Sequence, residues 1–343
     1  MQSFGANGRI KHRTRSSIPA LGRQRSPNNG EVVAVDNEIT EERNRLKAES
    51  LALFKAKNYA EIERRVQALR NPKEEFLDGY WKLPAFYNGI ADVADSEWEQ
   101  RIRDLEAWVK ASPKSVTAHA ALARCYYNGA HSARGSESSN KVTDAQWAAM
   151  NERADKGRKV LNDSASMRKQ CPYWYAAAQR IALLQAWPRE EYDRVIDEGL
   201  RVFPTYNDFH YSRLMYLLPR WFGKPGEMEA YMTKVADAKG REEGDMFYAK
   251  MVWDAQSNGG NIYRDTKISY DRARKGFNAL MMKTPDSFAL ASAFAFTACM
   301  RDEPKLAKIF FESKLRNHAD PTVWDTKEFY IKMRTMYTGK PSQ

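Results

Sequence analysis

The sequence predicts an all-α protein: a curved stack of antiparallel helix hairpins, an α-solenoid, that follows a disordered basic N-terminal tail. Three observations predict this fold. Apolar residues recur at spacings of three and four along most of the chain after residue 38. Prolines and glycines interrupt these segments at intervals that suit helix–turn–helix units. No window shows the alternating, β-branched pattern between turns that is typical of a strand.

Residues 1–37 form the predicted tail. They are rich in Gly, Ser, Asn, Pro and Arg and lack apolar periodicity, which is typical of a segment that cannot bury enough surface to fold. Residues 1–30 contain no acidic residue and six basic ones, which are Arg9, Lys11, Arg13, Arg15, Arg23 and Arg25. We expect an inert tail. The alternatives are a basic arm that contacts phosphates or nucleic acid, and an organelle-targeting peptide.

Composition limits the class of protein. The formal charge of the 343 residues is +11, but without the six basic residues of the tail 49 of the 55 basic residues remain against 44 acidic ones. This mild excess gives little support to nucleic-acid binding by the rest of the chain. No apolar run is long enough to span a membrane, and the three cysteines are too far apart for a metal knuckle or a redox pair. We expect a soluble, cytoplasmic protein.

The helical domain is expected over residues 38–343, with about 14 helices. A first hairpin over 39–69 turns at Lys57-Asn58, and Pro84 predicts a kink inside the next helix, 73–89. The following helices are 95–111, capped by Asp95 or Ser96, then 115–128, and 143–162, entered at Thr143 or Asp144. The polar segment 128–141 is predicted as a loop, inside an irregular insertion over 128–165.

The segment Cys171–Pro225 is predicted to contain one complete helix–turn–helix unit and the start of another. Later helices are expected at 226–238, 243–256, 263–283, 286–300, 303–317 and 322–337. Glycines and prolines mark the ends of these segments, among them Gly240, Pro285 and Pro304.

An internal repeat accompanies these helices. Pro172 and Pro204 are 32 residues apart, close to the roughly 34-residue period of tetratricopeptide (TPR) repeats. Ten residues after Pro113, Pro172, Pro204 and Pro285 stand Ala123, Ala182, Leu214 and Ala295; eight residues before three of these prolines stand Leu105, Ile196 and Phe277. Pro172 does not fit the second pattern, because Ser164 precedes it at that distance. The sequence therefore predicts a degenerate TPR-like array with one insertion.

Several motifs resemble those of a bacterial domain family of unknown function that is related to TPR repeats. The motifs are Trp108 with Ser112-Pro113 and Ser115, Ala133-Arg134-Gly135 followed by VTDAQW, CPYWY at Cys171–Tyr175, and LLPRWFGKP at Leu217–Pro225. The resemblance covers about residues 45–300. The histidine in NGAHSARG and the basic tail depart from the family pattern. The resemblance implies a TPR-like fold and no reaction, because the family has no established activity.

Motifs for catalysis or cofactor binding are not recognisable in the sequence. The five histidines include no HExxH pair, and the chain lacks GxGxxG, P-loop and GxSxG patterns. We therefore predict no metal, no cofactor and no enzymatic activity. His131 and Arg134 remain as a candidate site in the 128–141 loop. If the chain were an uncharacterised enzyme, Arg134 would bind a carboxylate or phosphate of its substrate. The alternative is that Arg134 holds the loop against acidic helix ends.

The leading functional hypothesis is a scaffold that binds another protein or an extended peptide on the concave face of the repeats. Counting from Pro172 and Pro204 places seven candidate side chains there, which are Tyr175, Gln179, Arg180, Asn207, His210, Tyr211 and Arg213. The alternative for these residues is packing in the core. The other functional hypotheses are a peripheral component of a nucleic-acid-containing assembly, anchored by the tail, and the enzyme with a site in the loop.

Overall fold

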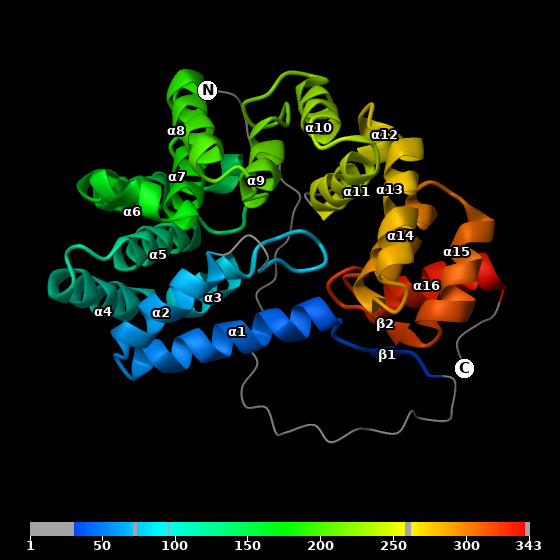
Figure 1. The fold of residues 1–343 in the computed structure, drawn as a ribbon, viewed down its shortest axis with the longest axis horizontal. Helices are drawn as coiled ribbons and strands as arrows, with labels where there is room; N and C mark the ends of the chain where they lie inside the picture. The colour runs from blue at the N-terminus through cyan, green and yellow to red at the C-terminus, as the bar shows by residue number, and fades with distance from the viewer. Residues whose placement is uncertain (1–30, 71–73, 95, 258–261, 340–343) are drawn as a thin grey trace. The chain divides into compact units, whose positions relative to one another are not determined.

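A computed structural model describes residues 31–70, 74–94, 96–257 and 262–339. These residues are almost entirely helical, which confirms the all-α prediction (Figure 1). The helices are α1 (Glu38–Lys55), α2 (Tyr59–Leu69), α3 (Lys82–Ala91), α4 (Trp98–Ala111), α5 (Val116–Arg134), α6 (Asp144–Asp163), α7 (Pro172–Leu184), α8 (Arg189–Val202), α9 (Asp208–Tyr216), α10 (Glu227–Asp237), α11 (Arg241–Ser257), α12 (Ile262–Asp265), α13 (Tyr270–Lys283), α14 (Phe288–Met300), α15 (Pro304–Phe310) and α16 (Lys327–Thr338).

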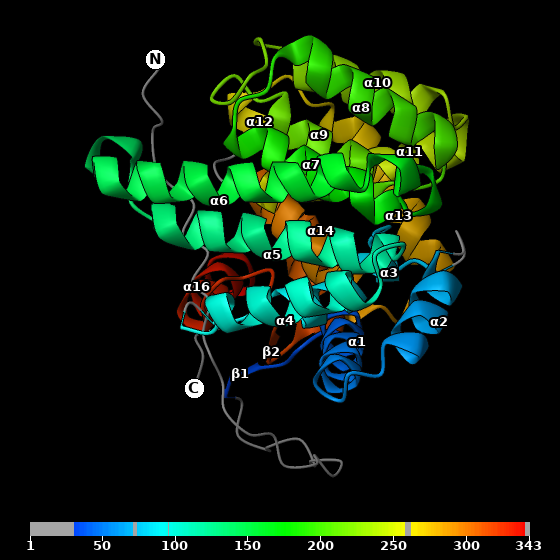
Figure 2. The same ribbon diagram turned by 90° about the vertical axis from the view of Figure 1, so that its left-hand side faces the viewer.

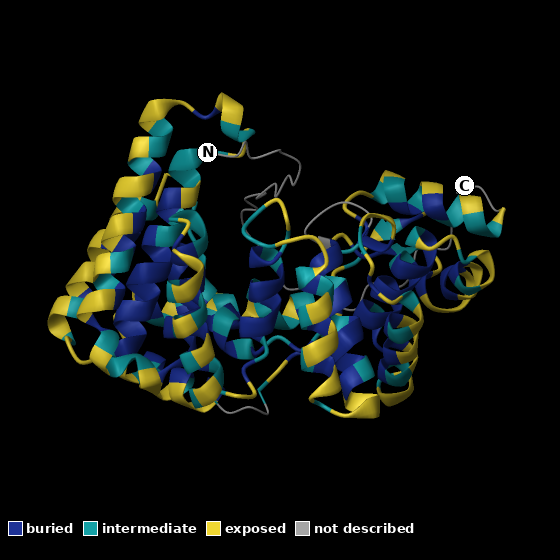
Figure 3. Ribbon diagram, turned by 90° about the horizontal axis from the view of Figure 1, so that it is seen from above, coloured by how far each residue is buried: buried dark blue, intermediate teal, exposed yellow. Residues whose placement is uncertain are grey.

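The described chain divides into two compact units. Of the described residues, the first unit contains those within 43–231, and the second contains those within 31–42 and 232–339. The predicted single domain over 38–343 therefore comprises two units, whose boundaries fall within α1 and α10. In each unit the buried residues lie where helices meet, and the exposed residues lie on the outer faces (Figure 3).

Helix α5 packs against several other helices of the first unit. Its neighbours are α3, α4, α6 and α7, and Figure 2 shows α4, α5 and α6 side by side. Five of the six alanines of α5 are buried, and a Cβ at Gly157 of α6 would lie 2.9 Å from Cδ1 of Ile181 and 3.2 Å from Cβ of Tyr126. Small residues thus let these helices approach closely.

The contacts of the first unit form two series. Consecutive helices pair as α2 with α3, α4 with α5, α5 with α6, α6 with α7, α7 with α8, and α8 with α9. In addition, α3 contacts α5, α5 contacts α7, and α7 contacts α9. We call the helices α3, α5, α7 and α9 the inner row. Each of its members packs against the next one and against the helix that precedes it in the chain.

In the second unit, α11 packs on α13, α13 on α14, and α14 and α16 on α15. Strand β1 (Val33–Ala34) pairs in parallel with β2 (His318–Ala319). Val32 is buried in the core of this unit, and Nδ2 of Asn37 donates a hydrogen bond of 2.6 Å to Oδ2 of buried Asp320. Residues 31–37, which the sequence assigned to the tail, are therefore part of the fold. Residues 1–30 lie outside the described residues.

Three of the predicted proline junctions have one turn geometry. Ser112, Phe203 and Thr284 each precede a proline, and their (φ, ψ) angles are (−135°, 66°), (−129°, 68°) and (−137°, 69°). A proline restricts the preceding residue to this extended range of φ. Each of these carbonyls also accepts a bond of 2.9 to 3.1 Å from the third following N–H, that of Ser115, Tyr206 and Ser287 respectively. Cys171 before Pro172 differs (φ −147°, ψ 120°), as the broken repeat pattern predicted.

A second turn geometry recurs where α1, α7 and α14 end. Lys57, Ala186 and Asp302 have positive φ of 54°, 50° and 52°. The following N–H groups, of Asn58, Trp187 and Glu303, donate to the carbonyls of Leu53, Ala182 and Ala298 at 2.9 to 3.1 Å. This six-to-one bond after a left-handed residue is the Schellman turn. The two turn types thus recur at corresponding places in the two units.

Several helix bounds differ from the prediction. Helix α3 begins only at Lys82, so Pro84 lies in its first turn, where a proline is tolerated and no kink is required. Helix α5 continues through Arg134, so half of the predicted 128–141 loop is helical. The insertion predicted over 128–165 is otherwise the regular helix α6, which starts at a capping box of Thr143 and Gln146. The helix expected over 263–283 is divided into α12 and α13. The predicted cap Asp95 lies outside the described residues.

Candidate functional site

The seven residues predicted to line a groove lie on α7 and α9 or beside them, in the first unit. Five of them are buried: Tyr175, Gln179, His210, Tyr211 and Arg213. Arg180 and Asn207 are half-buried. The structure therefore differs from the expected open groove, and the alternative of core packing describes the five buried side chains.

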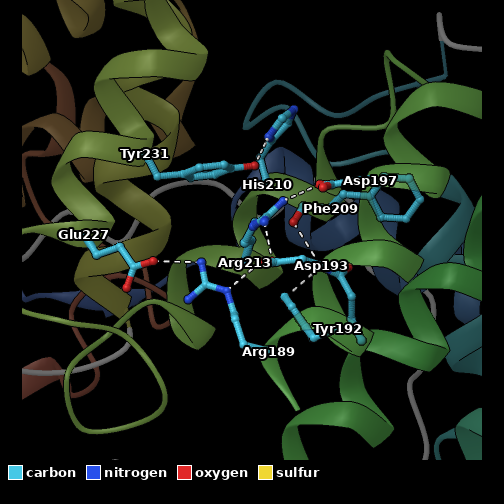
Figure 4. Close-up of polar contacts among 10 residues, drawn as sticks. Arg189, Tyr192, Asp193, Asp197, Phe209, His210, Arg213, Glu227 and Tyr231 are labelled. Carbon is cyan, nitrogen blue, oxygen red and sulfur yellow. Dashed lines mark hydrogen bonds and ion pairs between the residues drawn. The ribbon is translucent and has the colours of Figure 1, made fainter. Parts of the chain in front are cut away.

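Arg213 joins α9 to α8 through two ion pairs. Its Nη2 lies 2.5 Å from Oδ1 of Asp193, and its Nη1 lies 2.9 Å from Oδ1 of Asp197. Its guanidinium also lies 5.2 Å from the ring centroid of Tyr231. Arg189 extends this network, because it contacts both Asp193, at 2.6 Å, and Glu227, at 2.7 Å (Figure 4). The network connects α8, α9 and the start of α10.

The other buried groove candidates have internal partners of their own. Nδ1 of His210 lies 2.7 Å from the hydroxyl of Tyr231, and Nε2 of Gln179 donates to the hydroxyl of Tyr192 and to the carbonyl of Phe209, both at 3.2 Å. The hydroxyl of Tyr211 donates to the carbonyl of Asp78 at 3.3 Å. Tyr175 packs edge-on against Trp174, Phe203 and Phe209. These contacts specify how the inner row packs.

Arg180 differs from these residues, because it is only half-buried. Its guanidinium is 5.8 Å from the ring centroid of Tyr127 on α5, and Arg124 of the same helix lies 5.1 Å from that centroid. Sequence reasoning identified Arg180 but missed Arg124 and Tyr127. Their spacing of three residues, continued by Asn128 and His131, was the available signal, since it places polar side chains on one face of an alanine-rich helix.

The loop candidates His131 and Arg134 both lie in the last turn of α5. Nη1 of Arg134 donates to the carbonyls of Gly135 and Glu137, both at 3.1 Å, and its guanidinium lies 5.4 Å from the ring centroid of Trp147. Arg134 thus holds the turn that follows α5 through backbone carbonyls and an aromatic ring, whereas the alternative interpretation expected acidic helix ends. His131 is exposed, with its ring 6.2 Å from that of Tyr127.

Asp208, at the start of α9, is a buried acid that the sequence did not single out. It is 5% exposed, and burial raises the pKa of its carboxyl from 3.8 to about 7, although a hydrogen bond from the backbone N–H of Trp81 lowers it. A raised pKa in a buried carboxyl is common at functional sites and in structural networks alike. Asp208 lies in such a network, between α3 and α9.

The described part of the chain contains no group of three or more His, Cys, Asp or Glu side chains that could hold a metal ion. None of the helices in that part is long and apolar enough to cross a bilayer. Comparisons of the chain with protein-family models, with curated proteins and with solved structures found no match.

Proposed function

We propose that the chain is a TPR-like helical-repeat protein, without enzymatic activity, that binds another protein or peptide on its inner row. The observation behind this proposal is the recurrence of two turn geometries, the turn before proline and the Schellman turn, in a series of helix hairpins. Turns of constant geometry produce hairpins of constant shape, and such hairpins stack into curved arrays with an extended binding surface. The resemblance to TPR-related domains supports the same function.

The inner row is the surface that this function requires. In a stack of hairpins one helix of each pair lines the concave side, and α3, α5, α7 and α9 contact one another in that order. Their half-buried side chains include amide, aromatic and guanidinium groups, which are Asn88, Tyr127, Asn128 and Arg180. These groups suit hydrogen bonding to a peptide backbone and packing against its side chains.

Hydrogen exchange of a purified complex tests the proposal. A partner that co-purifies with the tagged full chain is produced separately and recombined with it, and titration calorimetry establishes saturable binding. We then expect slower amide exchange in α5 and α7 of the complex. Protection confined to α4, α6 and α8 would contradict the inner-row assignment, and turnover of a small molecule by the purified chain would contradict the absence of enzymatic activity.

A second function rests on the basic residues 1–30, which lie outside the described part of the chain. Their six positive charges without an acidic residue favour contact with phosphates, and hence a peripheral place in a nucleic-acid-containing assembly. Deleting residues 1–30 is then expected to flatten the salt dependence of association. Equal slopes for the full chain and the truncated chain would rule this function out.

A further inference from the structure

Two arginines flank one tyrosine ring on the inner row of the first unit. The guanidinium of Arg124 lies 5.1 Å, and that of Arg180 5.8 Å, from the ring centroid of Tyr127. Arg124 and Tyr127 belong to α5 and Arg180 belongs to the neighbouring α7. Both distances are within the range of cation–π attraction, so the ring helps to hold two positive charges close together.

Arg124 has too few partners for a buried cation. It is 8% exposed, and its single ion pair in the described chain is a long one, in which Nη2 lies 3.4 Å from Oδ1 of Asp92. Its Nε and Nη1 atoms are buried and have no hydrogen-bond partner among the described residues. Because a guanidinium has five N–H donors, most of the donors of Arg124 are unsatisfied. Arg213, which is equally buried, instead contacts two carboxylates at 2.5 and 2.9 Å.

The surrounding groups do not neutralise the pair. Asp92 also accepts a shorter bond, of 2.7 Å, from Nδ2 of Asn128, and Arg180 forms no ion pair with any described residue. Asp92 offsets one of the two positive charges. Asp208, whose pKa is raised to about 7 by burial although Arg180 lowers it, offsets the other only in part. Buried donors without partners, beside a second unpaired cation, are what a site for an anion requires before its ligand is bound.

We propose that Arg124 and Arg180 bind a small anionic group, a carboxylate or a phosphate, beside the ring of Tyr127. The unsatisfied donors of Arg124 provide the directional hydrogen bonds, and the half-buried Arg180 provides the second charge from the adjacent helix. Anion binding at this site does not depend on the proposed protein binding. A free anion and an anionic group of a partner protein present the same oxygen atoms to the two arginines. The interaction is binding alone and involves no covalent step.

Anion titrations of the purified full chain test this site. Sodium acetate and inorganic phosphate are titrated separately at constant ionic strength, and the thermal unfolding midpoint and calorimetric heat are followed. We expect saturable binding of at least one anion, and the anion that binds identifies the source as carboxylate or phosphate. In Arg180→Gln the Kd should rise at least about tenfold, the loss expected for one charge-assisted hydrogen bond. Arg134→Gln, the same charge change at the end of α5, should leave Kd unchanged.

Saturation by neither anion, or an equal loss of binding in Arg134→Gln, would overturn the proposal. Arg124→Met provides the second test, because replacing an under-compensated buried charge by an apolar side chain of similar volume is often neutral or stabilising. We expect an anion-free unfolding midpoint equal to or above that of the wild type, together with loss of the anion-induced rise. A lower midpoint with anion binding retained would mean that Arg124 is structural, and would also overturn the proposal.

Discussion

The backbone N–H of Trp81 donates a hydrogen bond of 3.2 Å to Oδ2 of Asp208, which follows it by 127 residues. The indole Nε1 of Trp81 donates to the carbonyl of Thr205 at 3.0 Å, and the ring lies edge-on to that of Tyr206, with centroids 4.9 Å apart. These contacts join the start of α3 to the start of α9. Asp208 is therefore placed by packing, and its burial raises its pKa to about 7.

We predict that Asp208 makes stability fall as pH rises. Because the folded-state pKa is about 7 and the ordinary value is 3.8, the folded protein binds this proton more tightly than the unfolded chain between these two pH values. The stabilisation is complete below the ordinary pKa and is lost as pH rises through 7. A rise of roughly three units corresponds to about 4 kcal/mol at most.

Urea unfolding at pH 5 and pH 8 measures this effect. Asp208→Asn keeps an acceptor for Trp81 but does not titrate. The stability of the variant should therefore fall less between pH 5 and pH 8 than that of the wild type, and at pH 8 the variant should be the more stable protein. Asp163→Asn, at an exposed position on α6, is the control and should retain the wild-type pH dependence. An unchanged pH profile in Asp208→Asn would show that the carboxyl is already ionised at neutral pH.

Ala186→Gly should stabilise the protein. Ala186 is exposed and has φ of 50° in the Schellman turn after α7, a conformation that costs a residue with a Cβ about 1–2 kcal/mol. Glycine removes this cost, but its greater conformational entropy in the unfolded chain lowers stability by about 0.5–1 kcal/mol. We therefore expect the free energy of unfolding to rise by about 0.5–1 kcal/mol. The midpoint of urea unfolding should rise with an unchanged slope.

The neighbouring Gln185 supplies the control for this substitution. Its φ is −89°, so Gln185→Gly relieves no strain. The change also removes the hydrogen bonds of the Gln185 side chain with Asp155 and Trp187, so stability should fall by at least about 1 kcal/mol. The argument for Ala186→Gly, relief of strain at a positive φ, also applies to Lys57→Gly and Asp302→Gly, because Lys57 and Asp302 have φ angles of 54° and 52°. Destabilisation by all three glycines would mean that these turns are not strained.

Helix existence could be predicted from the sequence because it depends on local spacing. Leu105, Ile196 and Phe277, the residues eight positions before the prolines, are all buried, as are Ala123 and Ala295 ten positions after them. The junctions were likewise predictable, because proline restricts the residue before it by local steric contact. In contrast, Pro84 does not kink a helix, because α3 begins only two residues before it.

The candidate site was much less predictable, because a helical periodicity does not show which face its neighbours cover. Tyr211 and Arg213 were expected on an open surface, but both are buried, by contacts with Asp78 and with Asp193 and Asp197. These partners are distant in the sequence or belong to the preceding helix. For the same reason Arg124 resembled an ordinary helix residue, since its lack of partners is a property of the tertiary structure.

Arg213→Ala should destabilise the fold and should not act as a selective binding variant. The change leaves Asp193 and Asp197 without their shared cation, and we expect a loss of about 2–3 kcal/mol, below the full value for a buried pair because Asp197 is largely exposed. Urea unfolding measures it. Arg201→Ala, on the exposed face of α8, is the control. If Arg213→Ala lost partner binding at unchanged stability, Arg213 would belong to the binding surface after all.

The last prediction concerns where the folded part of the chain begins. A chain that starts at residue 38 should be less stable than one that starts at residue 31, although the sequence pattern assigns both deletions to the tail. Residues 31–37 contribute the pairing of β1 with β2, the buried side chain of Val32 and the hydrogen bond from Asn37 to Asp320. Burial of one valine contributes about 1.5–3 kcal/mol.

The contribution of Asn37 can be isolated by point substitution. Asp320 is fully buried, so Asn37→Ala removes a partner from a carboxylate that water does not reach. It also removes the acceptor of the Thr40 N–H at the start of α1, and we expect a total cost of at least about 1–3 kcal/mol. Asp36→Ala, at the exposed neighbouring position, should cost little, because it removes only a like charge that raises the pKa of Asp320. Thermal unfolding of the two variants beside the two truncations measures both effects. Equal stability of the chains starting at residues 31 and 38 would place the boundary of the fold at residue 38 after all.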